Sequence, residues 1–296
     1  MRITQSTTAA VMLQGIETSY DSFQSLSAQI ASGLAINKPS DNPAGAVQVM
    51  SYDAEITRLG QYQTNANDGV AWLGSAQNAL ASVNSQLQRV QQLTQQAANG
   101  TTDAGGRAAI ADEVDSIKAT LLADANTTYL GRPIFGGTTG GTAAYDANGN
   151  YVGDSGAVNR KVAPVTAVQV NVLGTDAFGS GASSVFATLT QLSSDLRSAT
   201  AANTAAVGTT DLTAVQQAIT TLQNVQATVG SRYDEVQSQQ TQLQSRQTTL
   251  TTARSTVQDL DLAKAETELS TQQLTYQAAL EATSRVLSLS LTEFLK

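Results

Sequence analysis

The sequence predicts a mainly α-helical fold: an elongated helical bundle or coiled-coil rod built from both chain termini, with a small β-rich domain inserted at its tip. Three observations support this prediction. Apolar residues recur at helical spacing in both end regions. All four prolines lie outside those periodic segments, as uninterrupted helices require. The middle is different, because 14 of the 22 glycines lie between residues 100 and 181 and glutamine is absent from residue 97 to residue 168.

The first expected helix carries an apolar stripe over residues 13–34. Gly33 and the proline-containing segment after it are expected to end this helix, because proline and the residue before it both disfavour helical geometry. Ser40 or Asp41 is then expected to cap a second helix, with Pro43 in its first turn.

Longer repeats follow. The second helix continues its apolar repeat to Ala97, and a third helix is expected over residues 106–125. The most regular helix has an apolar residue at every seventh position from Val215 to Val257. At 1.5 Å per residue it would be about 70 Å long, more than the roughly 50 Å diameter of a compact chain of this size. The molecule is therefore expected to be elongated.

The second core position of each seven-residue repeat is apolar at the start of this long helix and polar further along. The sequence leaves open whether these polar residues leave slack in the packing or find polar partners. They are Gln226, Tyr233, Gln240, Gln247 and Arg254. A final amphipathic helix is expected over residues 262–295.

The middle region predicts β-structure. Residues 167–174 alternate like a half-buried strand, and Asn148-Gly149 is expected to turn a hairpin. We therefore expect three domains: a terminal coiled-coil assembly domain (1–45 with 258–296), a helical rod domain (46–132 with 184–257) and an inserted β-rich domain (133–183).

Composition excludes several functions. The chain has 296 residues, a net charge of −8, and neither Cys nor His. Zinc fingers, cysteine nucleophiles, disulfides and Ser–His–Asp triads are therefore impossible. The acidic balance argues against nucleic-acid binding, and the absence of a long apolar run argues against a membrane span. The first residues lack the apolar stretch of a secretory signal peptide. We predict no enzyme and no catalytic, cofactor-binding or metal-binding residues.

Two segments imitate known motifs. The Gly-rich residues 131–141 lack the lysine of a phosphate-binding loop, so a mobile entry into the β-insert is expected instead. Residues 146–157 partly match a calcium loop, but Tyr151 and Ala157 replace its glycine and its bidentate glutamate, which favours a hairpin. Asn99 and Asn126 match the glycosylation pattern and are interpreted as turn residues.

The terminal helices have unusually neutral faces. Residues 1–50 include only five charged side chains, so the face outside the apolar stripe consists of Ser, Thr, Ala and Gln. Such a face can be buried against other helices without a large desolvation cost. We therefore favour terminal helices that pair with each other and with neighbouring subunits over a purely intramolecular bundle. Two helices alone have little core, so they are expected to be loose in the free monomer.

Several segments together resemble the bacterial flagellin superfamily. They are Met1-Arg2-Ile3-Thr4, residues 29–33, residues 39–44, residues 126–137 and, near the C-terminus, residues 259–291. Asn42 and Pro133 depart from the family pattern, which often has Asp and usually an aromatic residue at these positions. The signature residues are Ser32, Gly33, Ser40, Asp41, Pro43, Arg132, Ile134 and Phe135.

The start of the chain and residues 132–137 are most similar to the branch of this superfamily that joins the flagellar hook to the filament. The resemblance implies a structural subunit outside the cell, exported by the flagellar type III apparatus without a cleaved signal. It implies association with the proximal junction protein, flagellin, the filament cap during assembly and an export chaperone at the C-terminal helix, and self-association in a ring. From the composition, we expect no nucleic-acid partner, membrane partner or cofactor. Two alternatives remain open: a flagellin filament subunit and a soluble coiled-coil adaptor or secretion chaperone.

The mechanism expected from this resemblance is coupled folding and assembly. Apolar residues of the N-terminal helix should pair with apolar residues of the C-terminal helix, while neighbouring subunits bury the neutral faces. The expected interface consists of Leu13, Ile16, Phe23, Ile30 and Leu34 on one side and Leu269, Tyr276, Leu280, Leu287 and Phe294 on the other.

Overall fold

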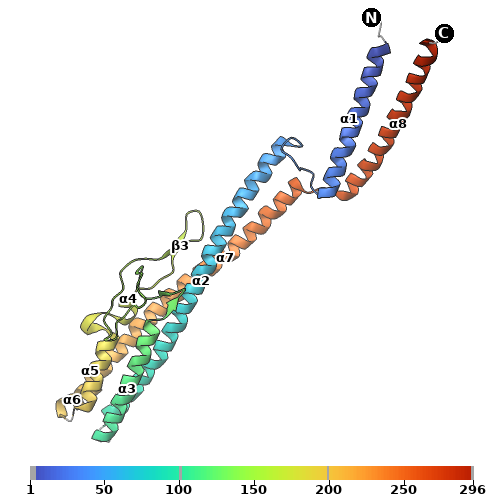
Figure 1. Ribbon diagram of the computed structural model, residues 1–296. Helices are drawn as coiled ribbons and strands as arrows, with labels where there is room; N and C mark the ends of the chain where they lie inside the picture. Colours follow the sequence, from blue (N-terminus) through green and yellow to red (C-terminus); the bar gives the residue numbers. More distant parts are fainter. Residues whose placement is uncertain (1–4, 100–101, 199, 295–296) are drawn as a thin grey trace. The chain divides into compact units, whose positions relative to one another are not determined.

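The computed structural model describes residues 5–99, 102–198 and 200–294; for residues 5, 6, 8, 9, 201 and 286–294 it describes the backbone alone. The described chain divides into two compact units, one formed by residues up to Arg58 and from Arg246 onward, the other by Leu59–Ser245. Five long helices dominate it (Figure 1): α1 (Gln5–Ser32), α2 (Pro43–Ala98), α3 (Ala104–Ala125), α7 (Leu212–Gln258) and α8 (Leu262–Phe294).

Helix α1 ends where the sequence predicts. Gly33 follows it with φ +72°, a left-handed conformation that glycine adopts without steric cost. The chain then runs beside the segment between α7 and α8, where Leu34 forms an antiparallel bridge with Asp259. The N–H of Leu260 donates to the carbonyl of Gly33 over 2.9 Å. These contacts join the α1–α2 connection to the α7–α8 connection within one unit.

The expected cap of α2 is wrong by one or two residues. The side-chain oxygen of Asn42, and not that of Ser40 or Asp41, accepts the hydrogen bond from the N–H of Gly45 (3.0 Å). Pro43 is the first residue of the helix, so the cap must directly precede it, and Asn42 does. Asp41 is occupied elsewhere, because its carboxylate closes the preceding turn.

The second unit has a deep core between α2, α3, α7 and α5 (Val185–Arg197). The seven-residue repeats predicted for α2 and α7 point into this core, and Leu73, Leu80 and Leu222 are fully buried. One polar position of α7 has a polar partner: Gln240 donates to Asn67 of α2 over 2.6 Å. In the first unit, Arg254 pairs with Asp53. Polar partners, and not slack, therefore occupy these two positions.

The β-insert consists of two small antiparallel sheets beside the helical core. Strand β1 (Thr128–Tyr129) pairs with β2 (Arg132–Pro133), and β3 (Asn159–Lys161) pairs with β4 (Ala167–Gln169). Shorter helical elements follow: α4 (Gly174–Phe178), the 3₁₀ turn η1 (Gly181–Ser183), α6 (Ala201–Ala206) and the π turn η2 (Val207–Asp211), which continues into α7. The predicted hairpin is present, with an antiparallel bridge between Tyr145 and Tyr151.

The strand predicted over residues 167–174 is wrong in extent, because β4 ends at Gln169. Beyond it, the buried Asn171 side chain replaces part of the backbone ladder. Its Oδ1 accepts from the N–H of Val158 (2.8 Å) and its Nδ2 donates to the carbonyl of Gly156 (2.9 Å). The alternating pattern therefore marks a half-buried extended segment of which only the first part is a regular strand.

Long helices from both ends of the chain and a small β-insert make the protein mainly α, which confirms the predicted fold class. Every helix of the described residues is too short or too polar to cross a membrane.

Candidate assembly surface

Helices α1 and α8 lie side by side (Figure 1). The less exposed positions recur at spacings of three and four on both helices, which is the pattern of a two-helix seam. On α1 they include Met12, Ile16, Ser19, Phe23, Leu26 and Ile30, and on α8 they are Ala265, Leu269, Gln272, Tyr276, Ala279 and Thr283.

Aromatic and polar contacts cross this seam. The rings of Tyr20 and Tyr276 lie 5.7 Å apart, centroid to centroid. The amide of Gln272 donates to the carbonyl of Ser19 over 3.0 Å and to its hydroxyl over 3.2 Å. A glutamine and a serine at the centre of the seam fix how the two helices align, because an unpaired buried amide would be unfavourable. The apolar pattern alone did not reveal these two residues.

The seam covers only part of the expected interface. Ile16, Phe23, Ile30, Leu34, Leu269 and Tyr276 are half-buried. Leu13 remains 57% exposed and Leu280 42% exposed. The side chains of Leu287 and Phe294 lie outside the described residues. Each helix of a pair has one partner, so only a narrow stripe of each is covered and residues beside that stripe stay in contact with water.

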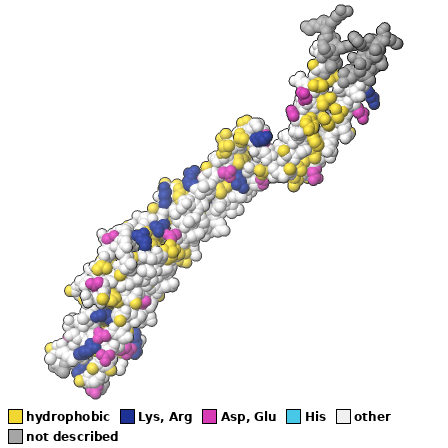
Figure 2. Space-filling view, viewed as in Figure 1, with side chains coloured by type: hydrophobic (Ala, Val, Ile, Leu, Met, Phe, Trp, Pro, Cys, Tyr) yellow, Lys and Arg dark blue, Asp and Glu magenta, His cyan; other side chains and the backbone are white. Residues whose placement is uncertain are grey.

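Apolar side chains also lie away from the seam. Leu274 of α8 is 68% exposed, and Val11 of α1 and Leu262 of α8 are exposed as well. Position 274 lies two residues from both Gln272 and Tyr276, so it projects from the opposite side of the helix. Figure 2 shows hydrophobic side chains along the visible face of this helix pair. This exposed set, Val11, Leu13, Leu262, Leu274 and Leu280, is called the outer apolar set below.

The N-terminal signature residues build the turn between α1 and α2. The hydroxyl of Ser32 accepts from the N–H of Leu34 (3.2 Å). The carboxylate of Asp41 accepts from the N–H groups of Asn37 (3.0 Å) and Lys38 (2.8 Å). Ser40 is exposed. Serine and aspartate thus satisfy backbone groups that the helix ends leave free.

The remaining signature residues lie in the other unit, at the base of the β-insert. Ile134 and Phe135 are fully buried, and the Phe135 ring meets Phe178 edge to face at 5.1 Å. Arg132 donates to the carbonyl of Thr138 over 3.2 Å. Leu130, at φ +49°, and Gly131, at φ +77°, form the two-residue turn between β1 and β2. This signature therefore supports the insert, and its structural role there is direct.

Two expectations for the insert require comment. The mobile entry expected over residues 131–141 is wrong for residues 133–137, which are buried. Asp154 holds this segment, because its carboxylate accepts from the Thr138 N–H (2.6 Å) and the Gly156 N–H (2.8 Å). Asp146 likewise accepts from the N–H groups of Asn148 (2.9 Å) and Asn150 (2.8 Å). Both carboxylates stabilise turns, as the hairpin interpretation requires.

Asn126 is also structural. Its Oδ1 accepts from the N–H groups of Ala144 and Tyr145 (both 2.8 Å), and its Nδ2 donates to the carbonyl of Tyr145 (2.9 Å). A glycan on Nδ2 would disrupt this clamp. The turn interpretation of Asn126 agrees with this geometry.

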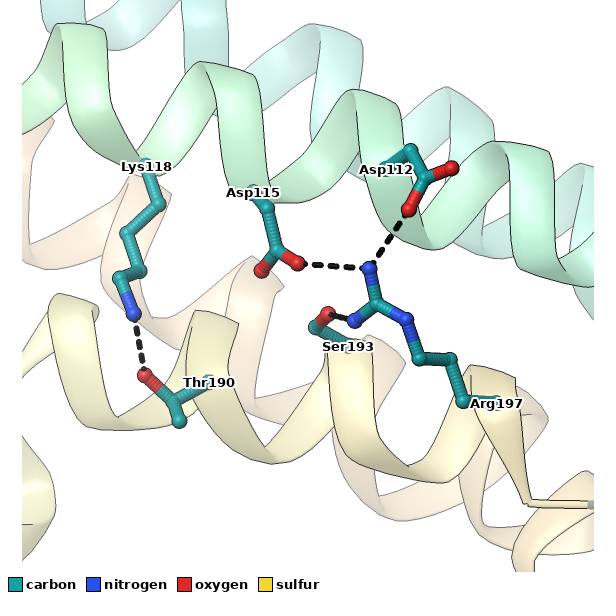
Figure 3. A network of polar contacts seen from close by, with 6 residues as sticks. All are labelled: Asp112, Asp115, Lys118, Thr190, Ser193 and Arg197. Carbon is teal, nitrogen blue, oxygen red and sulfur yellow. Dashed lines mark hydrogen bonds and ion pairs between the residues drawn. The ribbon is translucent and has the colours of Figure 1, made fainter.

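A polar network joins α3 to α5 (Figure 3). Arg197 contacts Asp112 at 2.7 Å and Asp115 at 2.8 Å, and it also donates to Ser193. Lys118 donates to the hydroxyl of Thr190 over 2.9 Å. These are partly exposed contacts that set how the two helices align. Within the part of the chain that the structure describes, no three acidic side chains gather in a group that could hold a metal ion.

Two family models match the chain. The bacterial flagellin N-terminal helical region matches residues 3–139, and the bacterial flagellin C-terminal helical region matches residues 212–295. Flagellin from Bacillus subtilis (strain 168) is 27% identical over 288 residues, which covers 94% of each chain. Flagellin from Escherichia coli (strain K12) is 38% identical over 88 residues, which covers 30% of this chain but only 18% of that protein.

Solved structures have the same fold. FlgL from Bacillus cereus is 26% identical, with a TM-score of 0.60 over 69% of this chain and 99% of that one. The flagellar junction protein FlgL from Legionella pneumophila is 14% identical, with a TM-score of 0.60 over 71% of this chain and 99% of that one. The fold and these matches define a structural, non-enzymatic protein of the bacterial flagellum. The chain belongs to the bacterial flagellin family.

Proposed function

We propose that this chain is the distal subunit of the hook–filament junction, on which flagellin polymerises. The observation that carries the proposal is the likeness to FlgL from Bacillus cereus, which extends over 99% of that protein at 26% identity. The insert supports it too, because the buried Ile134 and Phe135 lie at the base of a small domain between helices of the second unit. A junction subunit must bind a different partner at each of its two ends. This role requires no catalysis.

The proposed mechanism is coupled folding and assembly of the terminal helix pair. The seam leaves the outer apolar set exposed, and neighbouring subunits would bury it. Hydroxyl groups on both helices already donate hydrogen bonds within their own helix. Burial by a neighbouring subunit would therefore not leave these donors without a partner. Thr18 and Ser22 donate to carbonyls one turn earlier in α1 (both 2.8 Å), and Thr267, Thr271 and Thr275 do so in α8 (all 2.9 Å).

The partners in this proposal follow from the position in the flagellum. The subunit would form a ring, with the proximal junction protein on one side and flagellin on the other, and would contact the filament cap during assembly. An export chaperone would cover the C-terminal helix α8 before export. Export would use the flagellar type III apparatus without signal cleavage and would place the subunit outside the cell. The exposed apolar side chains of α8, including Leu274, support a need for such a cover.

A deletion strain tests the junction role. Cells lacking this chain should keep their hooks and release flagellin monomers into the medium, and the full chain supplied from a plasmid should restore filaments. Normal filaments in the deletion strain would contradict the proposal. The soluble adaptor alternative is tested by analytical ultracentrifugation, because an adaptor would keep its oligomeric state after removal of residues 1–40 and 265–296.

A flagellin filament subunit is the second candidate. The flagellin of Bacillus subtilis aligns with 94% of this chain, and its own length is covered to the same extent. Mass spectrometry of sheared, purified filaments separates the two functions. A filament subunit would be the dominant protein along the whole filament, whereas a junction subunit would be confined to the hook-proximal end in immunogold labelling.

Coupled folding has its own test. Circular dichroism should show that the purified monomer has less helix than the structure contains, and that deletion of residues 1–40 and 265–296 removes little of the measured signal. A monomer that has all the helix of the structure, and that loses the signal of the two terminal helices on deletion, would contradict coupled folding.

A further inference from the structure

Two buried carboxyl groups lie at the corner where α5 gives way to α6 and the π turn. Asp195, near the end of α5, is 6% exposed, and Asp211, the last residue of the π turn, is 4% exposed. Helix α5 packs against the π turn, and the negative charge of Asp195 acts on Asp211. Two buried carboxylates side by side repel each other strongly unless one is neutral or a cation lies between them.

The two groups differ in their hydrogen bonds. Asp195 Oδ1 accepts from Asn203 Nδ2 (2.8 Å), and Asp195 Oδ2 accepts from Gln191 Nε2 (2.9 Å). Asp211 Oδ2 is buried and has no hydrogen-bond donor among the described residues. A protonated Asp211 would become a donor itself, and Asp195 is the acceptor beside it. One proton between the two groups would therefore satisfy both.

Cations on the same helix do not compensate the pair. Arg197 is two residues from Asp195, but its guanidinium is directed to Asp112, Asp115 and Ser193. Figure 3 shows this arginine between the two carboxylates of α3. Helix α6, which packs against the π turn, has no charged residue.

The helices at the other side of the corner are engaged elsewhere. On α2, Ala98 lies against Gly208 of the π turn, and the last charged residue of that helix, Arg89, pairs with Glu113 at 2.8 Å. In the first turn of α3, Arg107 donates through Nη1 to the carbonyl of Thr102, and its buried Nε has no acceptor among the described residues. Burial and Asp195 raise the pKa of Asp211, and no cation lowers it. Among the described residues, a proton is therefore the simplest neutralising group for Asp195 and Asp211.

We propose that Asp195 and Asp211 share one proton in the folded protein, and that its loss between mildly acidic and neutral pH loosens the α5–α6 corner. Asn203 connects the pair to the start of α6, where Thr200 donates to Asn203 Oδ1 (2.7 Å) and its hydroxyl caps the helix. The π turn would respond first, because its i→i+5 bonding is rare and Asp211 closes it.

The direction of the effect follows from the raised proton affinity. Burial, and after it the negative charge of Asp195, raises the pKa of Asp211 to about 6. An unfolded aspartate has a pKa of about 3.9. The stabilisation is therefore complete below the unfolded value and is lost as the pH rises through the folded one. Between pH 5 and pH 7 this group alone should raise the unfolding equilibrium constant about tenfold.

Urea unfolding of the full chain at pH 5 and pH 7 tests the proposal. Asp211→Asn, a neutral variant of nearly the same shape, should lose the tenfold rise that the wild type shows. Asp234→Asn is the matched control, because Asp234 is an exposed aspartate on α7, and it should keep the rise. An equal pH response in the wild type and in Asp211→Asn would overturn the proposal.

Two measurements keep the test independent of that variant. In the wild type, the carboxyl carbon of Asp211 should titrate near pH 6 in a ¹³C NMR experiment, and titration below about pH 4.5 would overturn the proposal. Calcium or magnesium chloride should leave stability at pH 7 unchanged. If either ion restored the stability seen at pH 5, and did so through Asp211, a cation and not a proton would be the neutralising group.

Discussion

The terminal helix pair and the helical core of the second unit use the same kind of repeat and bury it to different extents. In the core, four helices surround Leu73, Leu80 and Leu222, which have no contact with water. In the pair, most of the apolar seam residues are half-buried, and the outer apolar set is largely exposed. The difference teaches that a seven-residue repeat predicts a helix and its partner-facing stripe, whereas the number of partners decides how much stability that stripe supplies.

The comparison has a functional consequence. Unit Leu59–Ser245 has a closed core of buried apolar side chains, whereas the terminal pair leaves the outer apolar set exposed, which fits the assembly that we propose. The first set of side chains should therefore matter for the monomer, and the second for the assembled flagellum. The predictions below test this division.

The largest effect is expected in the core. Leu80→Ala removes a fully buried side chain surrounded by fixed helices, so it should reduce the free energy of unfolding by about 2–5 kcal/mol. Urea unfolding followed by the fluorescence of Trp72, the single tryptophan and itself buried, measures this. Leu274→Ala is the control, and it should change the same quantity by no more than about 0.5 kcal/mol. Similar losses for both variants would break the comparison.

The outer apolar set should matter for assembly only. Leu274→Asp should leave the unfolding free energy of the monomer unchanged within about 0.5 kcal/mol, because position 274 is exposed. It should reduce incorporation into the flagellum by about tenfold or more, because assembly would bury an unpaired carboxylate. Immunoblots of purified flagella and of the culture medium measure the ratio. Normal incorporation would show that this face of α8 stays in water.

A smaller effect is expected at the start of α2. Asn42→Ala removes the side chain that caps the helix, which should cost about 1 kcal/mol. Ser40→Ala is the matched control, because Ser40 is an exposed neighbour that does not cap this helix. Thermal unfolding of both variants distinguishes them. Equal melting temperatures would mean that Asn42 does not cap the helix and that a residue of the preceding turn does.

The β-insert should weaken in acid. Hydrogen bonds from the N–H groups of Thr138 and Gly156 hold the pKa of Asp154 below its ordinary value, and the Asn150 side chain and backbone do the same to Asp146. Such carboxylates stabilise the fold above their ordinary pKa, and the stabilisation is lost as the pH falls through the lower folded value. Near-ultraviolet circular dichroism should change below about pH 4. Asp154→Asn should shift that change, and an identical acid transition would contradict the assignment.

The smallest effect is expected for the α3–α5 network. Arg197 and its two carboxylates are partly exposed, so Arg197→Met should lower the free energy of unfolding by less than Asn42→Ala does. The loss should shrink further in high salt, which screens exposed ion pairs. Unfolding at low and high sodium chloride concentration measures it, and a salt-independent loss would mean that packing and not charge is responsible.

The helices could be predicted because their repeats are long and unambiguous. The repeat predicted from Val215 to Val257 lies within α7, and α1 ends before Gly33, as the sequence predicts. Helix α5 is hard to predict as an element of its own, although Phe186, Leu189 and Leu192 have helical spacing, because glycines and strand-like residues directly precede it.

Polar contacts were harder to predict. Whether Asn42, Ser40 or Asp41 caps α2 depends on the backbone geometry of a few residues, which composition does not determine. The pairing of Gln272 with Ser19 joins residues that lie 253 positions apart in the sequence. Asn171 ends a strand through a side-chain contact that mimics the backbone. In each case the residue type alone does not predict the contact, because the contact depends on which partner the fold brings close.

Hydrogen exchange measured on the free subunit and on the same subunit in purified flagella tests the central claim most directly. In the free subunit, amides of α1 and α8 should exchange far faster than those of α2, α3 and α5 in the second unit, because the pair lacks a closed core. In the flagellum both sets should be protected. Terminal helices as protected as the core in the free subunit, with no further protection on assembly, would contradict the account.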